Sequence, residues 1–156
     1  MERLTNYILS PSAISMLSGS SKGTQAKYYD KGYWYKTNTV GSEGTAEYLA
    51  SLVLACSNIE DYVEYERCTI NNKPGCRSKN FLAPGESYIS IQRLYELYMG
   101  GQLTDHIYTM SDVNERIKYV VDFVKDVTGL DIYDYLSKML SFDALILNTD
   151  RHFHNI

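Results

Sequence analysis

The pattern of the sequence changes at Ala83-Pro84-Gly85, a segment that interrupts both helix and strand patterns. Before it, short runs rich in tyrosine and β-branched residues alternate with turn residues, whereas after it apolar residues recur at helical spacing. Strands and helices that are segregated along a chain are typical of an α+β fold. We therefore expect a strand-rich domain with one helix over residues 1–85 and a helical domain over residues 86–156.

The first part is predicted to contain two pairs of strands. Aromatic runs on both sides of Asp30-Lys31-Gly32 predict a β-hairpin. A second pair is expected on either side of the turn-forming segment 71–75. The four expected strands cover residues 25–29, 33–38, 62–69 and 76–82.

Four helices are predicted from capping residues and apolar spacing. The first covers residues 43–56 after Ser42 as its cap, and its apolar positions are Leu49, Leu52, Val53 and Cys56. The later three begin after Ser90, Ser111 and Asp131 as caps, and they end before Gly100, at Gly129 and near Asn148. Cys56 is expected to be a small core residue of its helix.

Composition excludes several classes of protein. The 156 residues, 44% of them hydrophobic, suffice for a real core, because a chain of this length buries roughly 70% of its unfolded surface. A net charge of −4 argues against a general nucleic-acid binder. Three cysteines without a CxxC pair, no long apolar run and no signal peptide lead us to expect a reduced, cytoplasmic protein without a membrane span.

The string Asn148-Thr149-Asp150-Arg151-His152-Phe153-His154-Asn155 follows an apolar helix and carries the clearest chemical signal. Phosphoryl transfer to a hydroxyl requires a carboxylate that orients the nucleophile and an oxygen ligand that holds Mg²⁺ on the phosphates. Asp150 and Asn155 supply both groups, although the same pair of residues can also form a simple Asx turn. Asp143 and Asn148 have the same spacing, so the longer string is the informative unit.

This string resembles the catalytic loop of the HipA-like serine/threonine kinases, the toxin kinases of type II toxin–antitoxin pairs and their relatives. The resemblance continues upstream in the same order. It includes a Gly-rich loop and strand (SGSSKGTQAKYY), a lysine strand (Tyr33-Trp34-Tyr35-Lys36), a glutamate helix (AEYLAS, residues 46–51) and a strand that enters an adenine hinge (CRSKNF, residues 76–81).

The resemblance implies a protein-kinase-like fold and an ATP- and Mg²⁺-dependent phosphorylation of a protein serine or threonine hydroxyl. Asp150 would be the catalytic base and Asn155 a Mg²⁺ ligand. Lys36 would contact the nucleotide phosphates and Glu47 would hold Lys36, with Glu43 as the competing partner one turn earlier.

The nucleotide would also contact backbone groups. Gly19 and Gly23 would let backbone N–H groups approach phosphate oxygens, and Ser18, Ser20 and Ser21 are candidates for autophosphorylation. The adenine base would bond to the backbone of Ser78, Lys79, Asn80 and Phe81. Trp34 departs from the family, in which a smaller residue lies near the adenine; alternation along the strand puts it on the same face as Lys36, where it could crowd the base or stack on it.

The family has a second Mg²⁺-binding aspartate in a DFG-like turn beyond the catalytic loop, and the sequence stops at Ile156 before such a turn. We therefore expect this chain alone to be weak or inactive as an enzyme. The alternative is a catalytically inactive module that binds nucleotide or a protein partner, such as a helix-turn-helix antitoxin. A lipid-kinase-like protein is less favoured, because no basic amphipathic segment supports membrane docking. A zinc site at His152 and His154 is also disfavoured, because no third ligand has suitable spacing.

Overall fold

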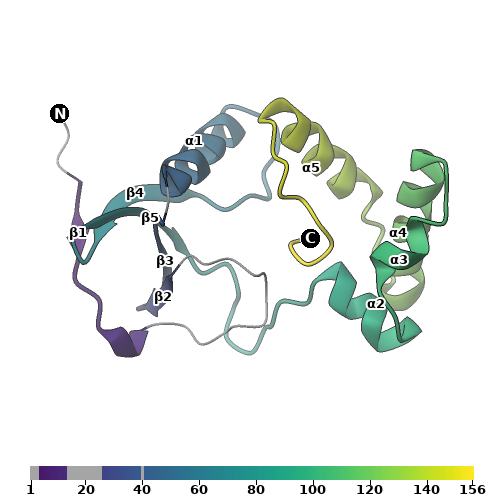
Figure 1. Cartoon of the computed structure of the whole chain (residues 1–156), viewed down its shortest axis with the longest axis horizontal. Coiled ribbons are helices and arrows are strands. Elements are labelled where there is room, and N and C mark those ends of the chain that lie inside the picture. The colour runs from purple at the N-terminus through teal and green to yellow at the C-terminus, as the bar shows by residue number, and fades with distance from the viewer. Residues whose placement is uncertain (1–3, 14–25, 40) are drawn as a thin grey trace. The chain divides into compact units, whose positions relative to one another are not determined.

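A computed structural model describes residues 4–13, 26–39 and 41–156, and it confirms an α+β protein with a mixed five-stranded sheet and several helices (Figure 1). The chain forms two compact units, Met1–Glu86 and Ser87–Ile156. The division lies one residue after the boundary expected from the sequence.

The sheet of the first unit has the strand order β1-β4-β5-β3-β2, with β1 parallel to β4 and every other pair antiparallel. The strands are β1 (Asn6–Tyr7), β2 (Lys27–Asp30), β3 (Tyr33–Thr37), β4 (Tyr65–Ile70) and β5 (Lys73–Lys79), and a short 3-10 turn, η1, covers Pro11–Ala13. The predicted hairpin is present: Lys31 and Gly32 both have positive φ, as the two-residue turn favoured between twisted strands requires.

The second hairpin has a shorter turn than the predicted segment 71–75. Asn71 and Asn72 form the turn alone, both with positive φ, which asparagine tolerates better than most residues. Pro74 consequently belongs to β5, where it pairs with Thr69 of β4. A proline is acceptable there because β3 ends at Thr37, opposite Gly75, and among the described residues the only backbone hydrogen bond beyond that end uses the Pro74 carbonyl, which accepts from the Asn38 N–H at 2.9 Å.

The two faces of the sheet differ sharply in chemistry. Directly paired residues share a face, so Lys27, Lys36 and Cys76 lie on one side, in register across β2, β3 and β5. On the other side Leu9, Tyr35, Cys68 and Ile70 form a buried cluster together with further tyrosines. Arg77 lies there with its guanidinium 4.7 Å from the ring centroid of Tyr7, and it bonds to Glu66. We call the first side the lysine face.

Helix α1 (Glu43–Ala55) packs against β5 and β4 (Figure 1). Its predicted cap, Ser42, makes no side-chain capping bond; the Gly44 N–H donates instead to Asn38 Oδ1 at 2.9 Å. The prediction of an apolar inner face is also wrong. Its buried residues are Gly44 and Ser51, because the helix lies too close to the sheet for large side chains between them. The predicted apolar positions are all exposed: Leu49, Leu52, Val53 and Cys56.

The second unit consists of α2 (Ile91–Met99), α3 (Leu103–Ile107), α4 (Val113–Thr128) and α5 (Tyr133–Leu145). Its core is made mainly by α2, α3 and α4, with the predicted stripe of α4 in it: Val120, Val121 and Val124 are buried and Ile117 packs against them. None of the helices in the described part of the chain combines the length and apolar character needed to cross a membrane.

Capping in this unit agrees with the sequence at three places and differs at the starts of α4 and α5. Ser90 accepts a hydrogen bond from the Arg93 N–H, and Gly100 and Gly129 end their helices with positive φ. Helix α4, however, is capped by Asp112 rather than Ser111, because the Asp112 carboxylate accepts from two backbone N–H groups of the first turn. Helix α5 begins after Ile132 rather than after the predicted cap Asp131, although the Asp131 carboxylate accepts from the Tyr133 N–H at 3.1 Å. It ends at Leu145, before the predicted end near Asn148.

Candidate functional site

The predicted lysine and glutamate meet on the lysine face. Lys36 Nζ lies 2.8 Å from Glu47 Oε1 and 3.0 Å from Oε2, so β3 and α1 are joined by a bidentate ion pair. The two side chains are 22% and 28% exposed. Of the two glutamates considered, it is Glu47 that bonds to Lys36; Glu43 accepts from the Gly41 N–H before the helix.

Tyr65 of β4 is a third contact of Lys36. Its hydroxyl lies 3.1 Å from Lys36 Nζ, and the ammonium lies 5.1 Å from the centroid of the ring. Burial by itself would lower the pKa of Lys36, but Tyr65 and Glu47 outweigh that effect and raise it. Lys36 therefore remains a cation throughout the physiological pH range.

Cys76 completes this cluster from β5. Its thiol donates to Glu47 Oε2 at 3.3 Å, so Glu47 is held by two strands of the sheet. Burial, reinforced by the neighbouring Glu47 carboxylate, raises the pKa of the Cys76 thiol. The thiol is consequently a hydrogen-bond donor here rather than a nucleophile.

The predicted adenine-binding segment lies at the end of β5. Ser78 and Lys79 are the last two strand residues, paired with Trp34 and Tyr33, and Asn80 and Phe81 follow the strand. The Asn80 N–H donates to Gly32 O at 2.8 Å and so is already used within the sheet. Phe81 has a side chain that is largely exposed.

Trp34 lies on the lysine face, as its alternation with Lys36 predicts. Its indole Nε1 donates to Asn80 Oδ1 at 3.2 Å, and its ring contacts that of Tyr29 with centroids 4.9 Å apart. The indole is therefore fixed between β2 and the end of β5. The Gly-rich loop with Gly19, Gly23 and the three candidate serines lies outside the described residues.

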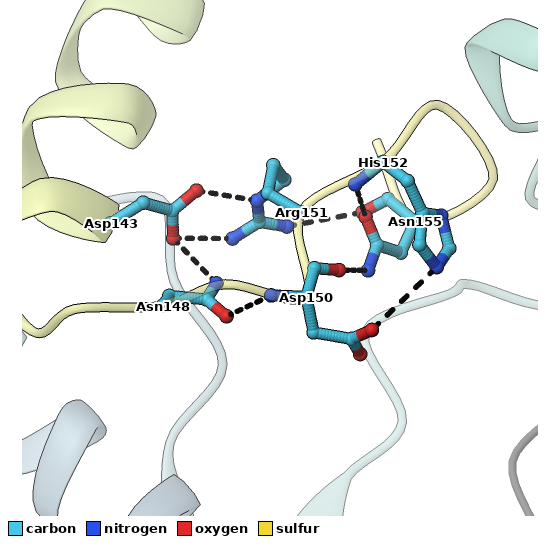
Figure 2. Close-up of polar contacts among 6 residues, drawn as sticks. All are labelled: Asp143, Asn148, Asp150, Arg151, His152 and Asn155. Carbon is cyan, nitrogen blue, oxygen red and sulfur yellow. Dashed lines mark hydrogen bonds and ion pairs between the residues drawn. The ribbon is translucent and has the colours of Figure 1, made fainter.

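In the second unit the predicted catalytic loop is anchored by an ion pair between Asp143 and Arg151 (Figure 2). Asp143 is a buried carboxylate of α5; its oxygens accept from Arg151 Nε at 2.6 Å and Nη2 at 2.9 Å, and from Asn148 Nδ2 at 2.8 Å. Burial opposes ionisation, but the bonds from Arg151 and Asn148 prevail and lower the pKa of Asp143. The loop is thus tied to a charged group in the helix before it.

Asp150 and Asn155 lie at opposite ends of a tight turn (Figure 2). The Asp150 carboxylate is 91% exposed, and His152 Nε2 lies 4.0 Å from its Oδ1. The Asn155 amide spans the turn: Nδ2 donates to Asp150 O at 2.6 Å, and Oδ1 accepts from the His152 N–H at 2.9 Å. The carboxylate of Asp150 is therefore presented to solvent by a turn that Asn155 closes.

Helix α2 also holds this loop through backbone hydrogen bonds. The N–H groups of Ile91 and Gln92 donate to Ile156 O at 2.9 Å and Phe153 O at 3.0 Å. Phe153 and Ile156 also pack against the core of the unit. These bonds use donors of the first turn of α2, which have no partners inside the helix.

Tyr65 and Asp143 were not identified as site residues from the sequence. Tyr65 comes near Lys36 through the pairing of β4 with β5, which was expected, and of β5 with β3, which the sequence does not specify. Asp143 did have a local signal, because it is the only charged residue in the apolar stretch Phe142–Leu147. A carboxylate in such a stretch is usually paired, and Arg151 is the nearest cation along the chain after Lys138.

Within the described residues, no group of three or more His, Cys, Asp or Glu side chains is arranged to hold a metal ion. Comparisons with protein-family models, with curated proteins and with solved structures found no match to this chain. The assignment of a function consequently depends on the chemistry of the two clusters described above.

Proposed function

We propose that this chain contributes the nucleotide-binding lobe and the catalytic loop of an ATP- and Mg²⁺-dependent serine/threonine protein kinase of the HipA-like type. The observation that carries the proposal is the bidentate pair between Lys36 and Glu47, which joins a sheet strand to the helix packed on the sheet. In kinases this pairing holds a lysine where it can neutralise nucleotide phosphates. Within the α+β class, we propose that the fold is that of a protein kinase.

The loop that ends the chain supports the second half of the proposal. An exposed carboxylate such as that of Asp150 can accept a hydrogen bond from a serine or threonine hydroxyl and take its proton as the hydroxyl attacks phosphorus. The Asp143–Arg151 pair fixes the backbone that carries Asp150. Such fixing reduces the entropy lost when nucleophile and base are aligned.

The residues present fit a Mg²⁺ ion only in part. Asn155 Oδ1 accepts one hydrogen bond and retains a second lone pair, so it can serve as one oxygen ligand without breaking the turn. A bound Mg²⁺ would neutralise charge on the phosphates. A further carboxylate would have to complete the site, and we propose that it comes from a DFG-like segment in the complete kinase.

The decisive experiment follows transfer of the γ-phosphate to protein in the full-length form of the kinase. Asp150→Asn should abolish transfer while ATP binding, read by the fluorescence of Trp34, stays within about threefold of the unmodified protein, because the base has no role in nucleotide affinity. Lys36→Met should abolish the ATP-dependent fluorescence change. Unchanged transfer in Asp150→Asn would contradict the proposed role of the loop.

The second candidate function is that of a catalytically inactive binding module. The hydrogen bonds of the Asn155 side chain favour it. Both atoms of its amide are engaged inside the loop, so the turn is stable without a metal. In that case the isolated chain would bind ATP equally with and without Mg²⁺, or would bind a protein partner alone. Autophosphorylation of the isolated chain by Mg-ATP would exclude this candidate.

A further inference from the structure

Lys27 lies directly opposite Lys36 on the lysine face. The two residues are cross-strand partners in the antiparallel pair β2–β3, so their side chains leave the sheet on the same side. Directly opposed like charges destabilise a sheet unless another charge lies nearby. Lys27 is half-buried on an edge strand, so solvent only partly screens the repulsion between the two ammonium groups.

The hydrogen-bond donors of the two lysines are used very differently. A lysine ammonium has three N–H donors, and Lys36 has three acceptors around it: the two oxygens of Glu47 and the hydroxyl of Tyr65. Lys27 makes no hydrogen bond or ion pair with any described residue. The three donors of Lys36 are thus all used, whereas no described residue accepts a hydrogen bond from Lys27.

The charges at this position do not balance. Glu47 supplies one negative charge against the two positive charges of Lys27 and Lys36. Burial and the nearby Lys36 lower the pKa of Lys27, and Glu47 only partly offsets them. An anion bound beside Lys27 would relieve that repulsion and would accept hydrogen bonds from its ammonium group.

We propose that Lys27 and Lys36 form a two-cation site for the oligophosphate chain of a nucleotide, in which Lys27 makes the first direct bond to a phosphate. The inference deepens the proposed kinase function and rests on it for the nucleoside part of the ligand. Lys27 acts there as a binding residue. Lys36, already held by Glu47 and Tyr65, supplies the neighbouring charge.

The test is a calorimetric titration of the full chain with ATP, with adenosine and with inorganic tripolyphosphate, without and with Mg²⁺. The variants are Lys27→Met, Lys27→Arg and Lys36→Met. Lys73→Met is the matched control, because Lys73 is exposed and lies on the other face of the sheet, in register with Ile70. Circular dichroism establishes that each variant is folded. Lys27→Arg keeps the positive charge and so tests whether a cation at this position is sufficient.

Lys27→Met should weaken tripolyphosphate and ATP at least ~10-fold, the loss expected for one hydrogen bond to a charged group, and leave adenosine unchanged. Lys27→Arg and Lys73→Met should both stay within about threefold of the unmodified protein. Equal affinities in Lys27→Met and Lys73→Met would overturn the role of Lys27.

The three ligands separate failure of this inference from failure of the proposed function. If ATP binds and only Lys36→Met weakens its binding, the role assigned to Lys27 is wrong and the kinase proposal stands. If tripolyphosphate binds through Lys27 while adenosine does not bind and ATP is no tighter, the anion site stands and the nucleotide function fails. If neither ATP nor tripolyphosphate binds, both are overturned.

Discussion

The backbone of Gly44 in α1 approaches that of Gly75 in β5 so closely that a β-carbon on Gly44 would lie 2.8 Å from the Gly75 carbonyl carbon. Gly75 is equally confined, since its own β-carbon would lie 2.2 Å from the carbonyl oxygen of Lys36. The first turn of α1 therefore rests on the strand beside Lys36. This close approach brings Glu47, one turn further along the helix, within bonding distance of Lys36.

Gly44→Ala should destabilise the protein, although helix propensity alone predicts a gain of about 1 kcal/mol for this change. The added methyl would meet backbone atoms of Gly75 and Cys76, and overpacking of this kind costs about 1–3 kcal/mol. The free energy of unfolding in urea, followed by circular dichroism, measures the balance. Gly41→Ala is the control, because its β-carbon meets nothing within 4 Å; a more stable Gly44→Ala protein would contradict the close contact.

Tyr65→Phe should remove one acceptor from Lys36 and keep the aromatic ring over the ammonium. Because Lys36 is mostly buried and charged, we expect a loss of about 1 kcal/mol in the free energy of unfolding. Tyr62→Phe removes a hydroxyl that makes no hydrogen bond to a described residue and should change the same quantity by less than about 0.5 kcal/mol. Equal effects of the two changes would show that the Tyr65 hydroxyl does not hold Lys36.

Asp143→Asn should lower the free energy of unfolding at pH 7 by about 3 kcal/mol, because it removes one partner of a buried ion pair. The folded-state pKa of Asp143 is lowered, so its contribution is complete above the unfolded-state pKa near ~3.9 and is lost as the pH falls through the folded value.

Urea unfolding from pH 7 to pH 2 measures this dependence, and the difference between the unmodified protein and Asp143→Asn should shrink below about pH 4. Asp126→Asn, on the exposed side of α4, is the matched control and should change the free energy of unfolding at pH 7 by less than about 0.5 kcal/mol. A difference that stays constant down to pH 2 would mean that the pKa of Asp143 is not lowered in the folded protein.

One of the three thiols should react rapidly with Ellman's reagent in the folded protein. Cys56 is exposed, whereas Cys68 and Cys76 are buried. Burial raises the pKa of Cys68 to about 11 and that of Cys76 further, so neither is a thiolate at neutral pH. Cys56→Ser should remove the rapid phase, and the other two should react only on unfolding.

Features set by neighbouring residues were predictable from the sequence. The turn at Lys31-Gly32 and the helix ends at Gly100 and Gly129 depend on backbone angles that a few residues determine. The α+β class followed from the order of the patterns. Ser111 and Asp112 are both good caps, and the sequence offers no means of choosing between them.

Features set by distant residues were not predictable. The pairing of β1 with β4 joins segments about sixty residues apart, and helix α3 is too short to show a helical period. The inner face of α1 was misassigned because close packing favours small residues there, which hydrophobic spacing does not detect. In the candidate site, Lys36 and Glu47 followed from the resemblance, whereas Tyr65 depends on strand register.

Helix α2 has a consequence for how mutations in this protein are interpreted. It carries none of the residues assigned a chemical role, yet its first two N–H groups hold the carbonyls of Phe153 and Ile156. Substitutions near Ser90, some sixty residues before Asp150, can therefore disturb the turn that carries the carboxylate. In a mutational screen they would resemble substitutions of Asp150 itself while acting only on the support of the loop.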